Sequence, residues 1–329
     1  MKRRFPCRAL MPLLLSALTV AAQAQTASSY PARPVRMIVP FAPGGASDFV
    51  GRILQPKLSE ELGQQVVIDN RAGASGNIGV ELTAHAPADG YTFLLGNVGT
   101  MAINPAVFDK FPVKPVRDFI CVSTVVDVAG ALAVHSSVPG NTLREFIDYV
   151  KARPGKLNYS AAAASSAQGL IMEYLKLKTG INIQQIPYKG GAGPATTALL
   201  SGEVAASLVT VASFVPHVKG GRVKVLAVVA AKRIAALPDV PTFLELGFNE
   251  LTTGSWQAVY LPAGTPSPVV KKIYAAVTKV MADPWVIERL GSGGADVITS
   301  KSPDDCGRFM KTQSEFWGKL VKQVGVTGE

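Results

Sequence analysis

The sequence has few of the residues on which metal and nucleophilic chemistry depends. It contains three cysteines and three histidines in 329 residues. There is no C-x-x-C pair, and His85, His135 and His217 stand far apart, so a zinc site is not predicted. The patterns G-x-G-x-x-G, G-x-x-x-x-G-K-[ST] and G-x-S-x-G are also missing, which argues against a nucleotide-binding loop and a hydrolase nucleophile elbow. No cofactor is expected.

Charged residues are scarce too, at 17% of the chain, whereas hydrophobic residues make up 48%. This balance excludes a disordered chain and supplies enough apolar material for two cores. Only one apolar run approaches membrane length, and it lies at the N-terminus, so a polytopic membrane protein is excluded. The net charge of +10 comes from scattered lysines and arginines without interleaved aromatic residues. Nucleic-acid binding is therefore not predicted.

Residues 1–24 have the composition of a secretory signal peptide. Basic residues within positions 2–8 and an apolar centre at residues 13–20 precede an A-x-A cleavage site that ends at Ala24. An uncleaved signal anchor is the alternative. We expect an exported chain that starts near Gln25. The segment carries four basic and no acidic residues, so its removal lowers the net charge from +10 to +6, and this mild positive field favours small anions.

Cleavage would leave two cysteines, Cys121 and Cys306. An oxidising compartment permits a disulfide between them. Two buried thiols are the alternative, and the sequence leaves both open.

Short β-rich runs alternate with amphipathic stretches along the rest of the chain. Strands are expected at residues 35–39, 65–69 and 91–95, with a helix in each interval, which gives a βαβαβ unit with parallel strands. A second α/β set follows, and then two helices with a short strand between them. The strands expected in the second set are residues 119–126, 130–135, 158–161, 183–186, 204–209 and 224–230, with helices beginning near Thr142, Ser166 and Pro194.

Local signals predict where several helices begin and end. Ser47 and Asp48 are expected to cap the first helix. Pro56 is expected to kink or break that helix, because proline removes a helical hydrogen bond. Ser267 and Ser302, each followed by proline, are expected to cap the two C-terminal helices.

Three loops share one design, in which small residues lie between a strand and the start of a helix. They are residues 43–48, 161–166 and 190–193. Glycine and alanine leave backbone N–H groups uncovered, and a helix N-terminus adds roughly half a positive charge, so each loop is suited to a carboxylate. Ordinary turn chemistry explains any one loop alone. Their occurrence in both halves of the chain favours a ligand site between the halves.

Several motifs together resemble those of one family of receptors. The runs VRMIVPFAPGGASDFVGRIL, VVIDNRAGASGNIG, ADGYTFLLGNVGTMAINP and IPYKGGAGPATTALLSGEV occur in this order. In this combination the chain is similar, from about Tyr30 to its C-terminus, to the solute-binding proteins of tripartite tricarboxylate transporters, the Bordetella uptake gene family.

The resemblance implies an α/β fold of the two-domain periplasmic-binding-protein kind (type II, Venus flytrap), with two strands that cross between the lobes. The crossings are expected near residues 121–133 and 226–259. Lobe 1 would comprise residues 25–125 and 251–329, and lobe 2 residues 126–250.

The resemblance further implies a periplasmic, monomeric receptor without catalysis. It would hold a small carboxylate or dicarboxylate in the interlobe cleft and deliver it to the integral membrane subunits of a permease. A ligand-sensing subunit for a signalling receptor is an alternative, and an α/β hydrolase or isomerase is a less favoured one. The positions expected to bind the ligand are Phe41, Gly44, Gly45, Ala46, Ser47, Asp48, Asn97, Gly99, Thr100, Ser160, Ser165, Ser166, Tyr188, Gly190, Gly191 and Ala205.

The sequence departs from the family pattern in lobe 2. Ala205 stands where the family usually has an aspartate, and Gly169 where a histidine is frequent. An ammonium group needs hydrogen-bond acceptors. Fewer acceptors therefore argue against amino-acid ligands and favour a carboxylate whose remainder is apolar or aromatic.

Overall fold

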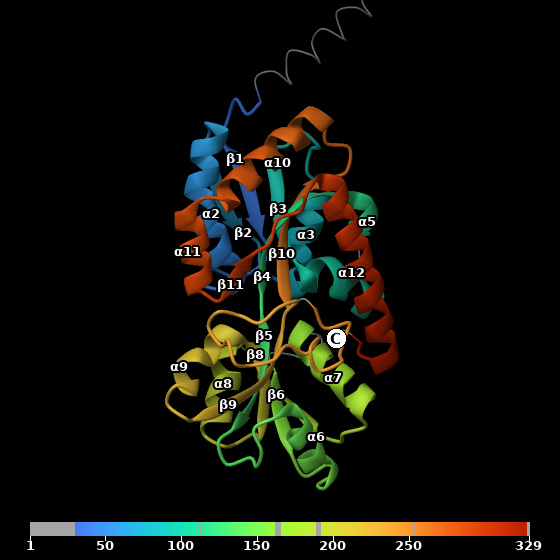
Figure 1. The fold of residues 1–329 in the computed structure, drawn as a ribbon. Helices are drawn as coiled ribbons and strands as arrows, with labels where there is room; N and C mark the ends of the chain where they lie inside the picture. Colours follow the sequence, from blue (N-terminus) through green and yellow to red (C-terminus); the bar gives the residue numbers. More distant parts are fainter. Residues whose placement is uncertain (1–29, 112, 162–165, 189–191, 253, 328–329) are drawn as a thin grey trace, which may run out of the picture.

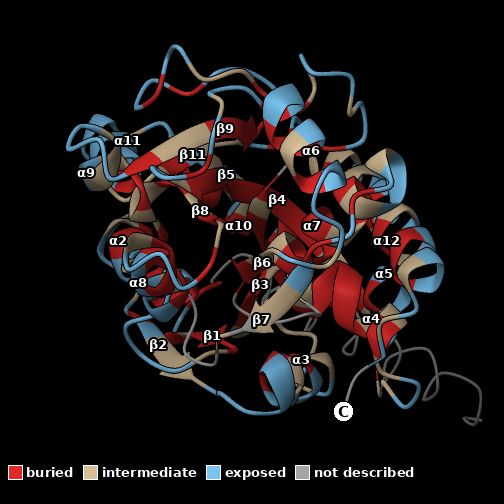
Figure 2. Ribbon diagram, turned by 90° about the horizontal axis from the view of Figure 1, so that it is seen from below, coloured by how far each residue is buried: buried red, intermediate tan, exposed pale blue. Residues whose placement is uncertain are grey.

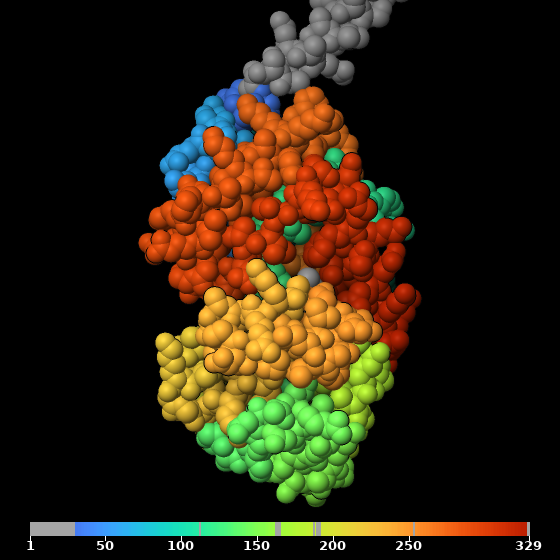
Figure 3. Space-filling model, in the orientation of Figure 1, coloured from blue at the N-terminus to red at the C-terminus, as the bar shows by residue number. Residues whose placement is uncertain are grey.

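The molecule consists of two α/β lobes stacked one above the other (Figure 1). The computed structural model describes residues 30–327 apart from residues 112, 162–165, 189–191 and 253. Each lobe has its own sheet, and the space-filling view shows the two lobes as separate masses with a recess between them (Figure 3). This is the arrangement of two α/β lobes that the resemblance implies.

The upper lobe is built on a six-stranded sheet with the order β11-β4-β10-β3-β1-β2. As predicted, its first three strands are parallel, because helices return the chain across the face of the sheet. One strand was not predicted as such: β10 runs antiparallel between β3 and β4. The strands are β1 (Val35–Val39), β2 (Val66–Asn70), β3 (Thr92–Asn97), β4 (Phe119–Val128), β10 (Ser255–Pro262) and β11 (Ala295–Val297).

The lower lobe is built on a five-stranded sheet with the order β7-β6-β8-β5-β9. Strand β6 pairs in parallel with β7 and β8, and β5 pairs antiparallel with β8 and β9. All five strands lie within two residues of the predicted positions. They are β5 (Gly130–His135), β6 (Asn158–Ala161), β7 (Gln184–Pro187), β8 (Ala206–Thr210) and β9 (Val223–Val229).

Helices cover both sheets. In Figure 2 the inner strands are buried, while the edge strands β2 and β7 are partly exposed and many helices expose their outward faces. No helix among the residues that the structure describes is both long and apolar enough to span a bilayer. The helices of the upper lobe are α2 (Ala46–Leu62), α3 (Asn77–Ala84), α4 (Asn104–Val107), α5 (Pro115–Asp118), α10 (Ser267–Met281), α11 (Pro284–Ser292) and α12 (Pro303–Val324). Those of the lower lobe are α6 (Leu143–Lys151), α7 (Ala167–Thr179), α8 (Ala192–Leu200) and α9 (Val215–Val218). Single turns are η1 (Ala74–Gly76), η2 (Gly99–Ile103) and η3 (Val211–Ser213).

Helix α2 corrects two predictions. It runs unbroken through Pro56, because the burial of its apolar face outweighs the roughly 3 kcal/mol that an interior proline costs. The N-cap position is occupied by Gly45, without a side-chain cap, so Ser47 and Asp48 lie inside the first turn instead of capping it. The buried apolar side chains of the helix are Val50, Ile53, Leu54, Leu58 and Leu62.

The caps of the later helices follow the sequence more closely. Ser302 caps α12 and accepts a hydrogen bond from the Asp305 N–H, as predicted. Helix α10 begins one residue earlier than expected: Pro266 takes the N-cap position and Ser267 is the first helical residue. Its start is therefore set by the two flanking prolines rather than by a serine side chain.

Helix α12 connects the two lobes along one side of the molecule (Figure 1). It packs on β4 and η2 of the upper lobe and on α7 of the lower lobe. A disulfide joins Cys306, near the start of the helix, to Cys121 in β4. The helix is thereby fixed to the upper lobe while its C-terminal half extends over the lower one.

The chain passes between the lobes where two segments touch. Strand β4 of the upper sheet leads through Ala129 directly into β5 of the lower sheet. The return path reaches the upper sheet at Gly254, just before β10. A Cβ atom at Gly254 would lie 2.3 Å from the Val128 carbonyl oxygen, so only glycine fits between the crossing segments. Both crossings fall in the predicted ranges.

Candidate ligand-binding site

A cavity of about 280 Å³ lies between the lobes. The upper lobe contributes the ends of its parallel strands, where ligands bind in open α/β sheets. The lower lobe contributes the first turn of α7, and the return crossing contributes Ser255. The lining residues are Phe41, Ser75, Asn97, Val98, Gly99, Asn104, Ser166, Ala167, Gln168 and Ser255. Of the predicted positions, the cavity brings together Phe41, Asn97, Gly99 and Ser166.

The side chain of Asp48 holds the first loop, residues 43–48, in place by hydrogen bonds. Its carboxylate is buried and accepts hydrogen bonds from the Gly44 N–H at 2.9 Å, from Asn70 Nδ2 at 3.0 Å and from Arg52 Nε at 2.7 Å. Burial raises the pKa of this carboxyl, but the hydrogen bonds outweigh burial and hold the pKa below its usual value. Asp48 is therefore charged at neutral pH and positions the loop without lining the cavity.

The loop held by Asp48 leaves small residues at the surface. Asn70 Nδ2 also donates to the Phe41 carbonyl at 3.0 Å, which fixes the aromatic residue that lines the cavity. Gly44, Gly45 and Ala46 are exposed next to it, and Ser47 is buried. A Cβ atom at Gly45 would meet only the Ala42 carbonyl oxygen, at 3.6 Å. The Gly44 N–H is taken by Asp48, so an anion at this turn would be held by the N–H groups that follow it, near which Gly45 places no side chain.

The loop after β2 is a part of the site that sequence reasoning missed. Ser75 lines the cavity with a φ of 56°, and Ala74 beside it has a φ of 46°. Such left-handed conformations are unusual for residues other than glycine and cluster at functional sites. Asn104 Nδ2 supports the loop by donating to the Ser75 carbonyl at 3.0 Å. The flanking pair Gly73 and Gly76 was the only sequence signal for this geometry.

The loop after β3 is held by a pair of hydrogen bonds between Asn97 and Thr100. The Thr100 N–H donates to Asn97 Oδ1 at 3.0 Å, and the Asn97 N–H donates to Thr100 Oγ1 at 3.1 Å. Thr100 is fully buried, so it positions Asn97 rather than facing the cavity. Because Oδ1 is occupied, the Asn97 side-chain NH₂ group remains to bind a ligand.

In the lower lobe, Ser166 caps α7 by accepting a hydrogen bond from the Gly169 N–H at 3.0 Å. Ala167 and Gln168 follow it in the wall of the cavity. A helix of this length presents free N–H groups and a partial positive charge at its start, which suits an anion.

Other predicted positions of the lower lobe lie elsewhere. Ser160 is buried and donates to the Ala195 carbonyl at 2.9 Å. The Tyr188 hydroxyl donates to Glu203 Oε1 at 2.6 Å. Ser165, Gly190 and Gly191 lie outside the described residues.

The placement of Ala205 corrects the sequence argument. It lines a separate hollow with Glu203, and its N–H donates to the carbonyl of Asn158, the first residue of β6. The cavity between the lobes lies beyond the other end of that strand. Residue 205 therefore does not determine which acceptors the cavity offers.

The electrostatics of the cavity still favour a ligand without an ammonium group. None of its described lining residues is charged or titratable between pH 3 and 10. A carboxylate would be held by N–H and hydroxyl donors, as occurs at anion-binding loops. Among the described residues, no group of three histidine, cysteine or acidic side chains is placed to hold a metal ion.

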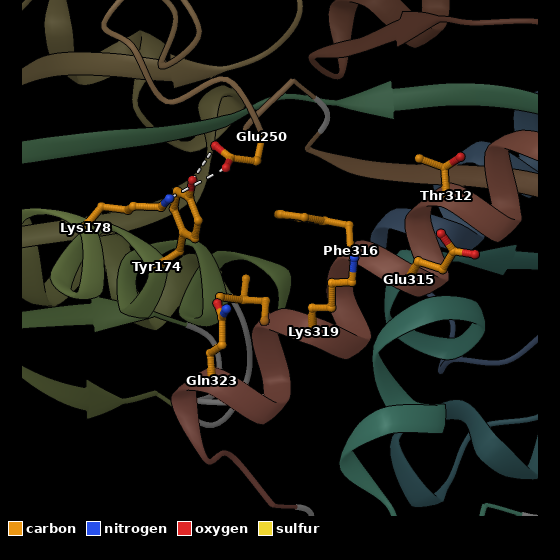
Figure 4. A pocket seen from close by; sticks show the side chains of 9 residues that line it. Tyr174, Lys178, Glu250, Thr312, Glu315, Phe316, Lys319 and Gln323 are labelled. Carbon is orange, nitrogen blue, oxygen red and sulfur yellow. Dashed lines mark hydrogen bonds and ion pairs between the residues drawn. The ribbon is translucent and has the colours of Figure 1, made fainter.

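A larger cavity, of about 380 Å³, lies outside this site, where α12 passes α7 (Figure 4). Two of the charged residues that line it are partnered: Glu250 accepts a hydrogen bond from the Tyr174 hydroxyl and lies 3.7 Å from Lys178 Nζ. Phe316 projects from α12 toward them and meets the Tyr174 ring edge-on, with the ring centroids 6.4 Å apart. No predicted position lines this cavity, which we regard as part of the contact between the lobes.

The two-lobed fold and the interlobe cavity, whose described lining residues are uncharged, are those of a solute-binding protein, and comparison with known proteins supplies its family. The sequence model of the tripartite tricarboxylate transporter family receptor matches residues 50–326. The chain therefore belongs to this family of periplasmic solute-binding proteins, whose members are not enzymes.

Individual relatives agree with this assignment. Protein BugT of Bordetella pertussis is 36% identical over 301 residues, which cover 91% of this chain and 92% of BugT. The structure of Rpa4515 of R. palustris with adipate has a TM-score of 0.78 and 34% identity, and covers 91% of this chain and 99% of that one. MatC of Rhodopseudomonas palustris with bound malate has a TM-score of 0.74 and 31% identity, and covers 89% of this chain and 100% of that one.

Proposed function

We propose that the protein binds a small carboxylate in the interlobe cavity and delivers it to the membrane subunits of a tripartite tricarboxylate-type transporter. The observation that carries this proposal is the convergence of the α7 N-terminus with the polar loops of the upper lobe around a cavity whose described lining residues carry no charge. Relatives with bound adipate and malate support the ligand class. Residues 1–24 would serve as the export signal, with cleavage near Ala24.

Within the carboxylates, we propose a ligand whose remainder is neutral. The apolar part of the cavity wall is formed by Phe41, Val98 and Ala167. No described lining residue supplies a carboxylate to pair with an ammonium group. Burying an unpaired ammonium is unfavourable by several kcal/mol. Dicarboxylates and aromatic acids should therefore bind more tightly than aspartate or glutamate.

Thermal unfolding in the presence of a carboxylate panel tests both statements. The panel should contain adipate, malate, a tricarboxylate, an aromatic acid, aspartate and glutamate. A ligand present at ~100 Kd stabilises the protein by about 2.7 kcal/mol. Absence of stabilisation by every member would contradict the proposed function, and preferential stabilisation by the two amino acids would contradict the neutral remainder.

Gly45→Val tests the role of the first loop. Gly45 has a φ of −81° and open space around its Cβ position, so valine should change the free energy of unfolding by no more than ~0.5 kcal/mol. Its branched side chain would cover the neighbouring N–H groups, and we expect at least a tenfold loss of affinity by calorimetry, about 1.4 kcal/mol. Gly291→Val, which places the same side chain on the exposed surface of α11, is the matched control. Unchanged affinity in Gly45→Val would remove this loop from the site.

A further inference from the structure

One acidic residue lies where the two crossing segments meet. The Asp127 carboxylate, at the end of β4, accepts the Gly254 N–H, with distances of 3.0 and 3.1 Å to its two oxygens. Gly254 is in turn packed against the Val128 carbonyl and Gly130 of the other crossing. Asp127 thus ties the outward and return paths of the chain together at the point where both pass between the lobes.

The surroundings of Asp127 disfavour ionisation of its carboxyl group. Asp296 of β11 lies directly opposite it in the antiparallel pair, so the two carboxyl groups share one face of the sheet. On its other side, Asp127 is paired with Trp256 of β10, and the α12 side chains that contact Trp256 are the uncharged Phe309 and Gln313.

Among the described residues, no cationic side chain offsets the charge of Asp127. The described residues of the crossings, from Val128 to Ala133 and from Gly254 to Val259, include no titratable side chain. Burial raises the pKa of Asp127 and the nearby Asp296 raises it further, and despite the hydrogen bond from Gly254 it reaches about 7. The group therefore changes its charge in the neutral pH range, which none of the described side chains that line the cavity does.

Two contacts connect Asp127 to the interface between the lobes and to the ligand cavity. Strand β11, which carries Asp296, begins directly after Gly294, and a Cβ atom at Gly294 would lie 2.9 Å from the Cβ atom of Ala212 in the lower lobe. Ser255, the residue after Gly254, lines the ligand cavity. Repulsion between Asp127 and Asp296 acts on the strand that bears the interlobe contact.

We propose that Asp127 is a proton-controlled hinge residue: its protonation favours the arrangement in which the lobes are in contact, and its ionisation favours their separation. The sign follows from linkage. Asp127 is half-buried with the lobes in contact, and their separation would expose it further; a conformation that buries a carboxyl group more deeply binds its proton more tightly than one that exposes the group to water. The ligand cavity requires both lobes, so acidification from pH 8 to pH 6 should tighten binding even though none of the described residues that line the cavity is titratable in this range.

Small-angle X-ray scattering of the whole chain without ligand tests this hinge independently of the proposed carboxylate. The radius of gyration is measured from about pH 5.5 to about pH 8.5, which brackets the pKa. We expect the wild type to expand with a midpoint near pH 7. Asp127→Asn, whose amide oxygen still accepts the Gly254 N–H, should stay compact throughout. Asp109→Asn, a substitution at an exposed turn of the upper lobe, should behave like the wild type.

Two further measurements decide the outcome if Asp127→Asn does not fold. Asp296→Asn should move the midpoint of the scattering transition to lower pH, because it removes the repulsion that disfavours ionisation of Asp127. The Asp127 carboxyl titration, followed by ¹³C NMR in the wild type, should share that midpoint. A radius of gyration that does not change with pH, or a transition that persists in Asp127→Asn, would overturn the proposal.

Discussion

At the residue scale, the site depends on side chains that never reach its cavity. Asp48 and Thr100 are buried beneath the loops that they hold, and they fix Gly44 and Asn97 by hydrogen bonds. Such residues carry the sequence motif but act by positioning backbone and amide donors. Loss of one should therefore reduce both stability and affinity.

Asp48→Asn tests this coupling. Asparagine keeps one accepting oxygen, so its NH₂ would face either Asn70 Nδ2 or the Gly44 N–H and Arg52 Nε, and each of these is a donor. Leaving buried donors unpaired costs about 1–3 kcal/mol. We expect chemical denaturation to show a loss of that size, and calorimetry to show at least a tenfold weaker affinity for whichever carboxylate the wild type binds.

Arg52→Gln is the matched control for Asp48→Asn. Its side chain is 58% exposed, and an exposed ion pair contributes no more than about 1 kcal/mol. If Arg52→Gln is as damaging as Asp48→Asn, the ion pair rather than the loop hydrogen bonds organises the site.

The residue scale also shows where sequence reasoning stops. The motifs located Phe41, Asn97 and Ser166 because each follows a strand or begins a helix. They could not locate Ser75 and Asn104, which meet only through the packing of two loops 29 residues apart. They misplaced Ala205, because a position next to a motif in the chain can lie at the opposite end of a strand.

At the element scale, strands and helices with a regular local pattern were predictable, and features that depend on distant parts of the chain were not. Strand β6 was predicted at its observed bounds, since its flanking loops and helices limit it on both sides. Strand β10 was expected only as part of a crossing segment, because its pairing between β3 and β4 joins parts of the chain about 130 residues apart. Pro56 shows the same limit: local propensity predicted a break, and tertiary packing kept α2 continuous.

The disulfide between β4 and α12 is the main covalent constraint at this scale. Cys121 and Cys306 are 185 residues apart and buried. Closing so long a loop in the unfolded chain should stabilise the fold by about 2–5 kcal/mol. Reduction should therefore lower the denaturation midpoint while leaving affinity nearly unchanged, since neither cysteine lines the cavity.

The control for reduction is the double variant Cys121→Ala, Cys306→Ala. Its stability should match that of the reduced wild type and should not respond to a reductant. Equal stability of oxidised and reduced wild type would contradict a bonded pair and favour two buried thiols.

At the scale of the whole molecule, stability should fall on both sides of a mildly acidic optimum. Asp48, Asp69 and Asp118 have pKa values held below the usual range by hydrogen bonds and ion pairs that outweigh burial. Their stabilisation is fully present above about pH 4 and is lost as the pH falls through their folded-state pKa values.

Asp127 contributes with the opposite sign. Its pKa rises from 3.8 to about 7 on folding, so the folded state binds the proton more tightly and the free energy of unfolding decreases as the pH rises from about 4 to about 7. Urea denaturation at a series of pH values should show this decrease in the wild type and in Asp109→Asn, and should lose most of it in Asp127→Asn. If the decrease persists in Asp127→Asn, another acidic residue causes it. If the stability of the wild type does not change from pH 5 to pH 8, folding does not raise the pKa of Asp127. The hinge would then lack the free-energy difference that its control by protons requires.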